Sequence, residues 1–293
     1  MLVLDGRDLR HLRRAGGLLV LRIRLRGPKG VENGTVEDGV VHAERSGRIE
    51  PIDSDRLTLP EPYELLRPID PPEVWCAGVT YERSRDARVE ESAVQDVYTL
   101  VYEAERPELF LKDAGCRRTV GPGEPIGVRS DSSWNVPEPE IGLVVGLDRE
   151  IIGVTIGNDV SSREIEGANP LYLPQAKVYA GACALGPAVL SPVTDEPLEI
   201  RMRILSDTGH ELFSGETSTA RMKRTFEDLV AFLLRENPVP PGSVLLTGTG
   251  LVPPDELTLE PGQLVEIEVP GIGILANPVV SAVSILERSL AHV

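Results

Sequence analysis

The segment from residue 137 to residue 164 constrains the fold more than any other part of the chain. It reads PEPEIGLVVGLDREIIGVTIGNDVSSRE, two apolar runs separated by a short polar stretch. Apolar runs of this length, rich in β-branched residues and joined by a turn, predict a β-hairpin. With a two-residue turn, or a four-residue turn about the same centre, Glu138 lies opposite Asp159 and Glu140 lies opposite Gly157. A turn of odd length would break this register.

The register sorts the side chains of both runs onto two faces, because alternate residues of a strand share a face. One face is apolar throughout and is expected to pack on a core; it carries Ile141, Leu143, Val145, Ile152, Val154 and Ile156. The other face carries Glu138, Glu140 and Asp159 beside Gly142, Gly146, Gly153 and Gly157. Since glycines have no side chain, this second face is expected to leave room for a bound group above the carboxylates.

Three carboxylates on one face repel each other unless a cation neutralises them or some of them take up protons. Oxygen ligands with no histidine or cysteine nearby favour Mg²⁺ over zinc, with Mn²⁺ or Ca²⁺ as alternatives. Each carboxylate taken singly is more typical of a solvated strand face than of a metal site. The shared face, the register and the glycines together predict a metal site at Glu138, Glu140 and Asp159.

The overall composition narrows the function classes. The 293 residues are 41% hydrophobic, as in an ordinary globular protein, and the formal net charge of −16 disfavours nucleic acid or an anionic membrane as a partner. No apolar run approaches the roughly 18 residues of a membrane span. Three widely spaced cysteines, Cys76, Cys116 and Cys183, indicate neither a disulfide framework nor a zinc site. The first residues do not resemble a secretory signal, so a cytoplasmic location is expected.

Turn signals divide the chain into two expected domains. Residues 1–68 contain short alternating pieces, which predict a small β-rich N-terminal domain, and residues 69–293 hold the motifs. Helices are expected over residues 82–106 and 222–236. Their apolar faces would be Val89, Ala93, Val97 and Leu100 in the first helix, and Phe226, Leu229 and Leu233 in the second. Most other segments favour strands, so the predicted fold class is α+β, predominantly β.

The motifs together carry a family resemblance. EPEIGLVVG, followed by GVTIGNDVSSRE, Lys177 and GPAV, resembles the fumarylacetoacetate hydrolase family. Further matching segments, VWCAGVTY, PELFLKDAG and VLLTGTG, extend the resemblance over most of residues 70–285. The resemblance implies a catalytic domain with a mixed β-roll, assembled as a homodimer or a dimer of dimers, that uses Mg²⁺ to act on a small 2-keto acid.

The resemblance also implies roles for single residues. The family's metal ligands fall on Glu138, Glu140 and Asp159, and its active-site lysine falls on Lys177. A turn that helps to hold the substrate falls on residues 247–250, with Gly248 and Thr249 as the candidate contacts. Lys112 matches a family lysine near the pocket and is a further candidate substrate contact, although a structural salt bridge is an equal alternative.

One departure from the family pattern narrows the range of reactions that is expected of this chain. Carbon–carbon hydrolases of the family carry a water-activating histidine in a lid segment, and Ser84 stands at that position here. The chain's four histidines, His11, His42, His210 and His292, lie far from every motif in sequence. The chain is similar instead to the family's 2-keto-3-deoxy-D-arabinonate dehydratase branch, which eliminates water from the sugar acid to give 2,5-dioxopentanoate.

The expected reaction proceeds through a metal-stabilised enolate, formed when a C3 proton leaves the substrate. Lys177 is the candidate base, Glu90 or Glu91 in the charged helix is the candidate proton donor, and Ser84 is a candidate substrate contact. Three alternatives stay open. They are a hydrolase, decarboxylase or tautomerase of an acylpyruvate-like acid, Schiff-base dehydration through Lys177, and a non-catalytic sugar-acid-binding protein.

Overall fold

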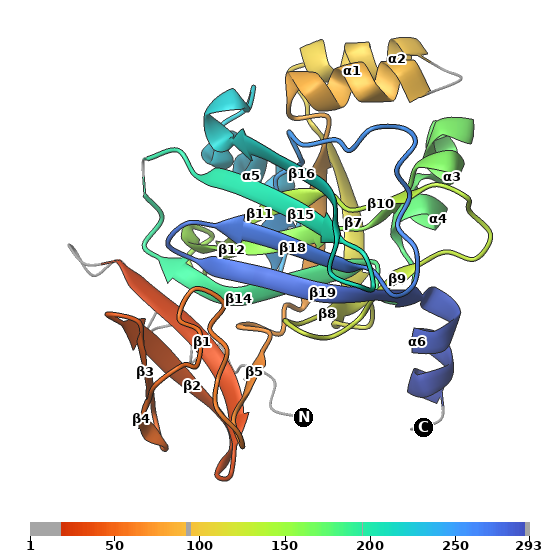
Figure 1. The fold of residues 1–293 in the computed structure, drawn as a ribbon. Helices are drawn as coiled ribbons and strands as arrows, with labels where there is room; N and C mark the ends of the chain where they lie inside the picture. Colours follow the sequence, from red (N-terminus) through yellow and green to blue (C-terminus); the bar gives the residue numbers. More distant parts are fainter. Residues whose placement is uncertain (1–18, 92–94, 195, 291–293) are drawn as a thin grey trace.

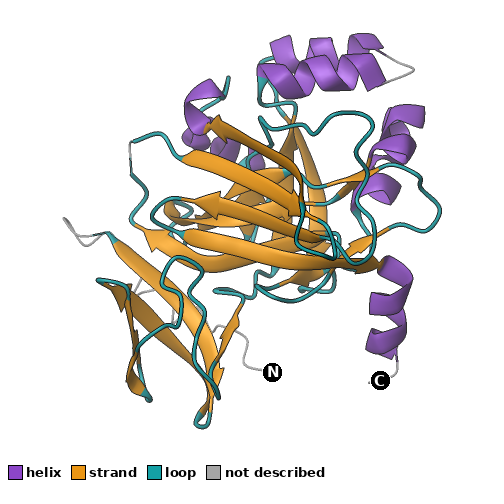
Figure 2. Cartoon of the chain, viewed as in Figure 1, coloured by secondary structure: helices purple, strands orange, loops and turns teal. Residues whose placement is uncertain are grey.

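Strands make up most of the structure, a computed structural model that describes residues 19–91, 95–194 and 196–290, with the side chains of residues 88–96 outside the description (Figure 1, Figure 2). The strands are β1 (Val20–Gly27), β2 (Gly30–Glu37), β3 (Val40–Ala43), β4 (Gly47–Ile49), β5 (Glu64–Leu66), β6 (Glu73–Gly78), β7 (Glu108–Ala114), β8 (Thr119–Val120), β9 (Ile126–Val128), β10 (Asn135–Val136), β11 (Pro139–Val145), β12 (Ile151–Asp159), β13 (Ser161–Ser162), β14 (Cys183–Ser191), β15 (Glu199–Leu205), β16 (Glu211–Ser218), β17 (Val244–Leu246), β18 (Leu264–Val269) and β19 (Gly273–Ser281).

Helices are fewer and lie at the periphery (Figure 2). The α-helices are α1 (Glu82–Glu91), α2 (Gln95–Glu103), α3 (Arg163–Ala168), α4 (Leu173–Lys177), α5 (Phe226–Leu234) and α6 (Ala282–Leu290), and the 3₁₀ helices are η2 (Pro170–Tyr172) and η3 (Thr219–Arg221). No helix among the described residues has the length and apolar character that a bilayer crossing requires.

Two sheets stack on each other and enclose the main core (Figure 1). The larger has the order β4-β3-β2-β1-β14-β12-β11-β17-β6-β7, with β5 added to β1 and β8 added to β14. The smaller has the order β16-β15-β18-β19-β9, and β10 pairs with β13 separately. Both contain parallel and antiparallel pairs, such as parallel β17–β6 and antiparallel β11–β12. The prediction of a predominantly β, α+β fold is confirmed.

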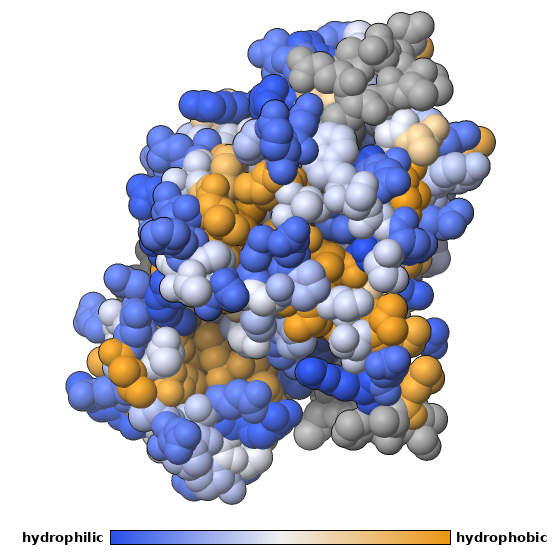
Figure 3. Space-filling view, turned by 45° about the vertical axis from the view of Figure 1, so that its right-hand side comes forward, coloured by the Kyte–Doolittle hydropathy of each residue, from blue (hydrophilic) through white to orange (hydrophobic). Residues whose placement is uncertain are grey.

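The core is built from the alternation of each strand. Ile200, Met202 and Ile204 of β15 are buried, whereas the residues between them are exposed. They belong to the same apolar cluster as Ile141 and Val154 of the hairpin. On the outside, hydrophilic side chains cover most of the face in Figure 3, with apolar patches between them.

The N-terminal strands continue the larger sheet. β1 pairs with β14 in antiparallel register, with Val20 opposite Ser191 and Arg22 opposite Val189. Glu266 of β18, only 3% exposed, forms ion pairs with Arg56 of the N-terminal part and with Arg203. These contacts join the N-terminal part to the rest of the chain, while the boundary between residues 68 and 69 stays a prediction.

The hairpin has the predicted register at the site but reaches it differently. Glu140 lies opposite Gly157, as expected. The turn is odd in length, however: Gly146 donates a hydrogen bond to the carbonyl of Glu150, which leaves three residues between them. A β-bulge at Ile152 compensates by one residue and restores the register. Ile152 therefore packs with the small cluster of Val144 and Leu246, and its predicted place on the main core face is wrong.

The expected single helix over residues 82–106 is also wrong. Two helices, α1 and α2, occupy this range, and they lie over one end of the sheets (Figure 1). Val97 and Leu100 are 37% and 67% exposed, because α2 buries Tyr98 instead. Val89 and Ala93 lie outside the described side chains.

The second predicted helix is confirmed as α5. Leu229 and Leu233 are buried in the main core, and Phe226 packs against it. The Thr225 hydroxyl caps the helix by accepting a hydrogen bond from the amide of Asp228.

Candidate metal centre and active site

Three carboxylates meet where β11 begins and β12 ends. Glu138 precedes β11, Glu140 lies within it, and Asp159 is the last residue of β12. Their nearest oxygen atoms all lie within 4.8 Å of one another, and the three residues are between 1% and 4% exposed. The amide of Asp159 donates a hydrogen bond to the carbonyl of Glu138 at 3.0 Å, which holds the two strand ends together. The predicted meeting of these side chains is confirmed.

Buried cations lie on one side of this cluster. The Lys177 ammonium group, at the end of α4, lies 3.0 Å from Glu138 Oε2 and 2.9 Å from Asp159 Oδ2. Lys112 forms an ion pair with the other oxygen of Asp159 and donates to the carbonyl of Val160. Arg163 Nη2 lies 3.4 Å from Glu138 Oε1. Glu138 and Asp159 therefore share the available positive charge.

Glu140 lies in a different electrostatic environment. Burial raises the pKa of its carboxyl well above the ordinary value, and the charges of Asp159 and Glu138 raise this pKa further. Burial also acts to raise the pKa of Asp159, but Lys112 and Lys177 outweigh it, and that pKa is lowered. The cluster is thus deficient in positive charge at Glu140. Carboxylate oxygens in this arrangement fit a hard divalent cation such as Mg²⁺.

A glycine turn after β17 holds Glu140 in place. The amide of Gly248 donates a hydrogen bond to Glu140 Oε2 at 2.6 Å. Gly248 has φ of +86°, and a Cβ atom at this position would lie 2.2 Å from Thr80 Oγ1. The Thr80 hydroxyl in turn donates to the carbonyl of Thr247 at 2.6 Å. Only glycine combines this backbone conformation with this close approach.

A small buried cavity of about 20 Å³ adjoins the carboxylates, which is room for about one water molecule. It is lined by Ala77, Gly78, Val79, Ser84, Glu108, Phe110, Glu138, Glu140, Asp159, Glu166, Lys177, Gly248 and Thr249. The predicted site residues Ser84, Lys177, Gly248 and Thr249 therefore lie together with the three carboxylates.

The remaining predicted site residues are placed less directly. Lys112 is fully buried in contact with Asp159 but does not line the cavity, which favours the salt-bridge alternative. The Thr249 hydroxyl exchanges hydrogen bonds with the backbone of Leu251. Glu90 and Glu91 belong to α1, and their side chains lie outside the described residues.

Three residues at or beside this site were not predicted. Glu108 and Glu166 line the cavity, and Arg163 contacts Glu138. Arg163 and Glu166 are one turn apart in α3, a spacing that places both on the same helix face. Glu108 is four residues before Lys112 in β7, so strand alternation places both on one face. These spacings were the available signals, but only the fold shows which face each side chain occupies.

The glycine face of the hairpin is not open in the way the sequence suggested. A Cβ atom at Gly157 would lie 2.3 Å from Leu246 Cδ2, and one at Gly142 would lie 2.9 Å from Val244 Cγ1. These two glycines admit the side chains of β17 rather than a ligand. The space for a ligand lies beyond them, at the carboxylate end.

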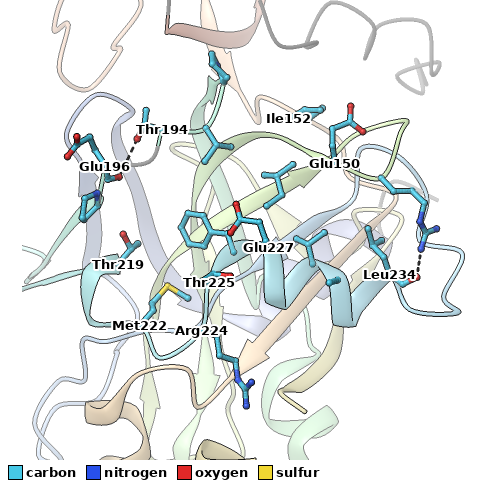
Figure 4. A pocket seen from close by; sticks show the side chains of 18 of the residues that line it. Glu150, Ile152, Thr194, Glu196, Thr219, Met222, Arg224, Thr225, Glu227 and Leu234 are labelled. Atoms are coloured by element: carbon cyan, nitrogen blue, oxygen red, sulfur yellow. Dashed lines mark hydrogen bonds between the residues drawn. The ribbon is translucent and has the colours of Figure 1, made fainter. Parts of the chain in front are cut away.

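A much larger cavity, of about 970 Å³, lies elsewhere. Its walls include Glu150 and Ile152 near the hairpin turn, Thr194 and Glu196, and α5 (Figure 4). None of the predicted site residues lines it. The size of a cavity therefore does not identify the candidate active site of this protein, whereas the cluster of charged residues does.

Comparison with known proteins agrees with this site. Residues 73–280 match the fumarylacetoacetate (FAA) hydrolase C-terminal family. The chain is 50% identical over 214 residues to a probable 2-keto-3-deoxyxylonate dehydratase of Haloferax volcanii, covering 72% of this chain and 73% of that protein. It is 44% identical over 224 residues to 2-dehydro-3-deoxy-D-arabinonate dehydratase of Saccharolobus solfataricus, covering 73% and 74%.

A solved structure is also similar to this chain. It is 2-keto-3-deoxy-D-arabinonate dehydratase complexed with magnesium and 2,5-dioxopentanoate. It matches with a TM-score of 0.76 at 33% identity, over 90% of this chain and 99% of that one. The predicted fold is confirmed by this match. The chain belongs to the fumarylacetoacetate hydrolase family.

Proposed function

We propose that this protein is a Mg²⁺-dependent dehydratase of a 2-keto-3-deoxy sugar acid, which converts 2-keto-3-deoxy-D-arabinonate to 2,5-dioxopentanoate. The observation that carries the proposal is the contact of buried Lys177 with two of three clustered carboxylates. The similarity to two dehydratases supports the choice of reaction within the family. The serine at position 84 agrees with a reaction that needs no water as a nucleophile.

Glu138, Glu140 and Asp159 would hold the Mg²⁺ ion. When bound, the ion supplies Lewis-acid stabilisation of the negative charge that develops on a 2-keto acid during proton removal. The raised pKa of Glu140, caused by burial and then by its two carboxylate neighbours, supports a cation site at this end of the cluster. Mn²⁺ and Ca²⁺ remain alternatives, because they take similar oxygen ligands.

Lys177 is the base in this proposal. Its amine accepts a proton from C3 of the substrate, for which it must first give up the proton with which it pairs with Glu138 and Asp159. The C4 hydroxyl group then leaves as water after it is protonated. A proton shift from C5 to C3 gives an enol, and transfer of the enol proton to C4 gives the aldehyde of 2,5-dioxopentanoate.

The proton donor for the leaving hydroxyl group is a carboxylic acid. Glu90 or Glu91 of α1 stays the predicted donor. Ser84 at the cavity wall, together with Gly248 and Thr249, is proposed to contact the substrate, and Lys112 to orient Asp159. A pentonate is far larger than the cavity described above, so the walls must open to admit it.

The decisive test is product analysis. Purified protein is incubated with 2-keto-3-deoxy-D-arabinonate and Mg²⁺, and the products are separated by mass spectrometry. We expect 2,5-dioxopentanoate; pyruvate as the main product would contradict the proposal and indicate carbon–carbon cleavage. Borohydride treatment during turnover tests the Schiff-base alternative, since a trapped adduct on Lys177 would replace the metal-enolate version.

Assembly and location are predictions of the same kind. We propose a homodimer or a dimer of dimers in the cytoplasm. Light scattering coupled to size-exclusion chromatography measures the assembly, and a monomer at micromolar concentration would contradict it.

A further inference from the structure

A further hollow, of about 540 Å³, is lined in part by segments that follow Lys112 and Lys177 in the chain. Arg117 and Arg118, which closely follow Lys112 in the chain, line one part of it. Val178 to Ala180, which directly follow Lys177, line another part. Chain segments close to Lys112 and Lys177 thus form part of the walls of this hollow.

Positive charge is concentrated at the hollow although the chain as a whole carries −16. Its lining includes Arg117, Arg118 and Arg129, against one acidic residue, Asp131. Arg129 pairs with Asp131, and Arg118 lies 3.2 Å from a carboxylate oxygen of Asp113. Within the described ranges, no carboxylate pairs with the guanidinium group of exposed Arg117. Arg117 is therefore available to an anion from solvent.

The rest of the hollow is apolar. Val283 and Leu286 of α6 line it, although they are 46% and 52% exposed. Tyr179 also lines the hollow, and the centroid of its ring lies 5.5 Å from Arg129 Cζ and 6.0 Å from Lys112 Nζ. Tyr179 is 8% exposed, and its hydroxyl group has no hydrogen-bond partner among the described residues.

We propose that this hollow is a binding site for a small organic anion that combines a carboxylate or phosphate group with an apolar body. Arg117 binds the anionic group, since a guanidinium group matches carboxylate and phosphate in geometry. Val283 and Leu286 contact the apolar body, as in a typical small-molecule site. None of the residues that line the hollow belongs to the carboxylate cluster, and binding there does not depend on the proposed dehydratase activity.

Isothermal titration calorimetry with phenyl phosphate, benzoate, inorganic phosphate and neutral benzyl alcohol tests the proposal. Titrations contain EDTA and are made at constant ionic strength, so that metal coordination does not contribute. We expect phenyl phosphate or benzoate to bind, and benzyl alcohol not to bind. Comparison of the phosphate and carboxylate arms identifies which anionic group is preferred.

Variants locate the binding. Arg117→Gln is expected to weaken binding by about tenfold, the effect of losing one charge-assisted contact. Leu286→Glu, which adds a repelling charge at the apolar wall, is expected to weaken it at least as much. Arg201→Gln serves as the control, because it removes an exposed arginine of β15 that pairs with Glu268 of β18. Absence of binding by both phenyl phosphate and benzoate, or equal affinities in the Arg117 and Arg201 variants, would overturn the proposal.

Discussion

The ammonium group of Lys177 lies 2.9 Å from a carboxylate oxygen of Asp159, in a site where both side chains are almost completely buried. The same ammonium group also contacts Glu138 at 3.0 Å. One lysine therefore has two tasks: it balances the charge of two carboxylates, and it is the proposed base. The first prediction measures both tasks.

Replacing Lys177 with methionine, which has a similar length and no charge, should abolish proton removal. We expect kcat to fall by roughly 10²–10⁴-fold, the usual contribution of a positioned base. The metal-free protein should also lose about 3–5 kcal/mol of unfolding free energy, because two buried carboxylates lose a partner. Steady-state kinetics and urea denaturation measure both effects. Lys29→Met, at an exposed position, is the control; near-normal turnover by Lys177→Met would exclude the lysine as the base.

Glu140→Gln should stabilise the metal-free protein and weaken Mg²⁺ binding. The pKa of Glu140 is raised by burial, then by Asp159 and Glu138, so the charged form costs stability as pH rises above the unfolded pKa. Glutamine removes that cost at neutral pH but also removes a proposed metal ligand. Thermal unfolding in EDTA measures the first effect and Mg²⁺ titration the second.

Glu32→Gln is a matched control with the opposite sign. Glu32 is also buried, but hydrogen bonds from Ser46 and from the amide of Arg45 outweigh burial and lower its pKa. Its charged form therefore stabilises the fold above the unfolded pKa, and this stability is lost as pH falls. We expect Glu32→Gln to lower the melting temperature at neutral pH. If both variants shifted it in the same direction, the electrostatic description of Glu140 would be wrong.

Removal of metal should stop the reaction and addition of Mg²⁺ should restore it. Since Glu140 retains a proton more readily than an ordinary glutamate, Mg²⁺ has to displace that proton, and its affinity should fall as pH is lowered. Activity after EDTA treatment and Mg²⁺ titrations at several pH values test this. Full activity in metal-stripped protein would refute the proposed metal dependence.

Gly248→Ala should disturb the Glu140 side of the site. A Cβ atom there would collide with Thr80, and a left-handed conformation alone costs about 1–3 kcal/mol for a residue other than glycine. Gly271 has the same φ of +86° but no heavy atom within 4 Å, so Gly271→Ala isolates the conformational cost. We expect Gly248→Ala to be the more destabilising variant and to weaken Mg²⁺ binding. If Gly248→Ala and Gly271→Ala lowered the free energy of unfolding in urea equally, the close approach to Thr80 would not contribute to the destabilisation.

The hairpin shows how far the sequence could predict the site. Alternation and a symmetric turn placed Glu140 opposite Gly157, and the structure agrees. The turn itself has three residues, and the bulge at Ile152 corrects the register, which no local pattern indicated. A bulge is favoured by packing against neighbouring strands, so its position depends on contacts that are distant in sequence.

Long-range contacts also explain what the sequence did not predict. Leu100 has helical spacing with Val97, yet it is exposed, because what a helix buries depends on the surface beneath it. Glu108 and Arg163 look like ordinary charged residues until β7 and α3 bring them to the site. Lys177, by contrast, was found from its family motif, and the structure places it beside the carboxylates.

The pairing of β1 with β14 means that the catalytic part is not separable by a simple cut. Without β1, the backbone donors and acceptors of residues 189–191 would form an unpaired strand edge. The other end of the same strand, at Cys183, pairs with Asp159. An unpaired strand edge of this kind pairs with strands of other chains. A shortened protein would therefore tend to self-associate, and any loosening of that strand would be transmitted along it to a proposed metal ligand.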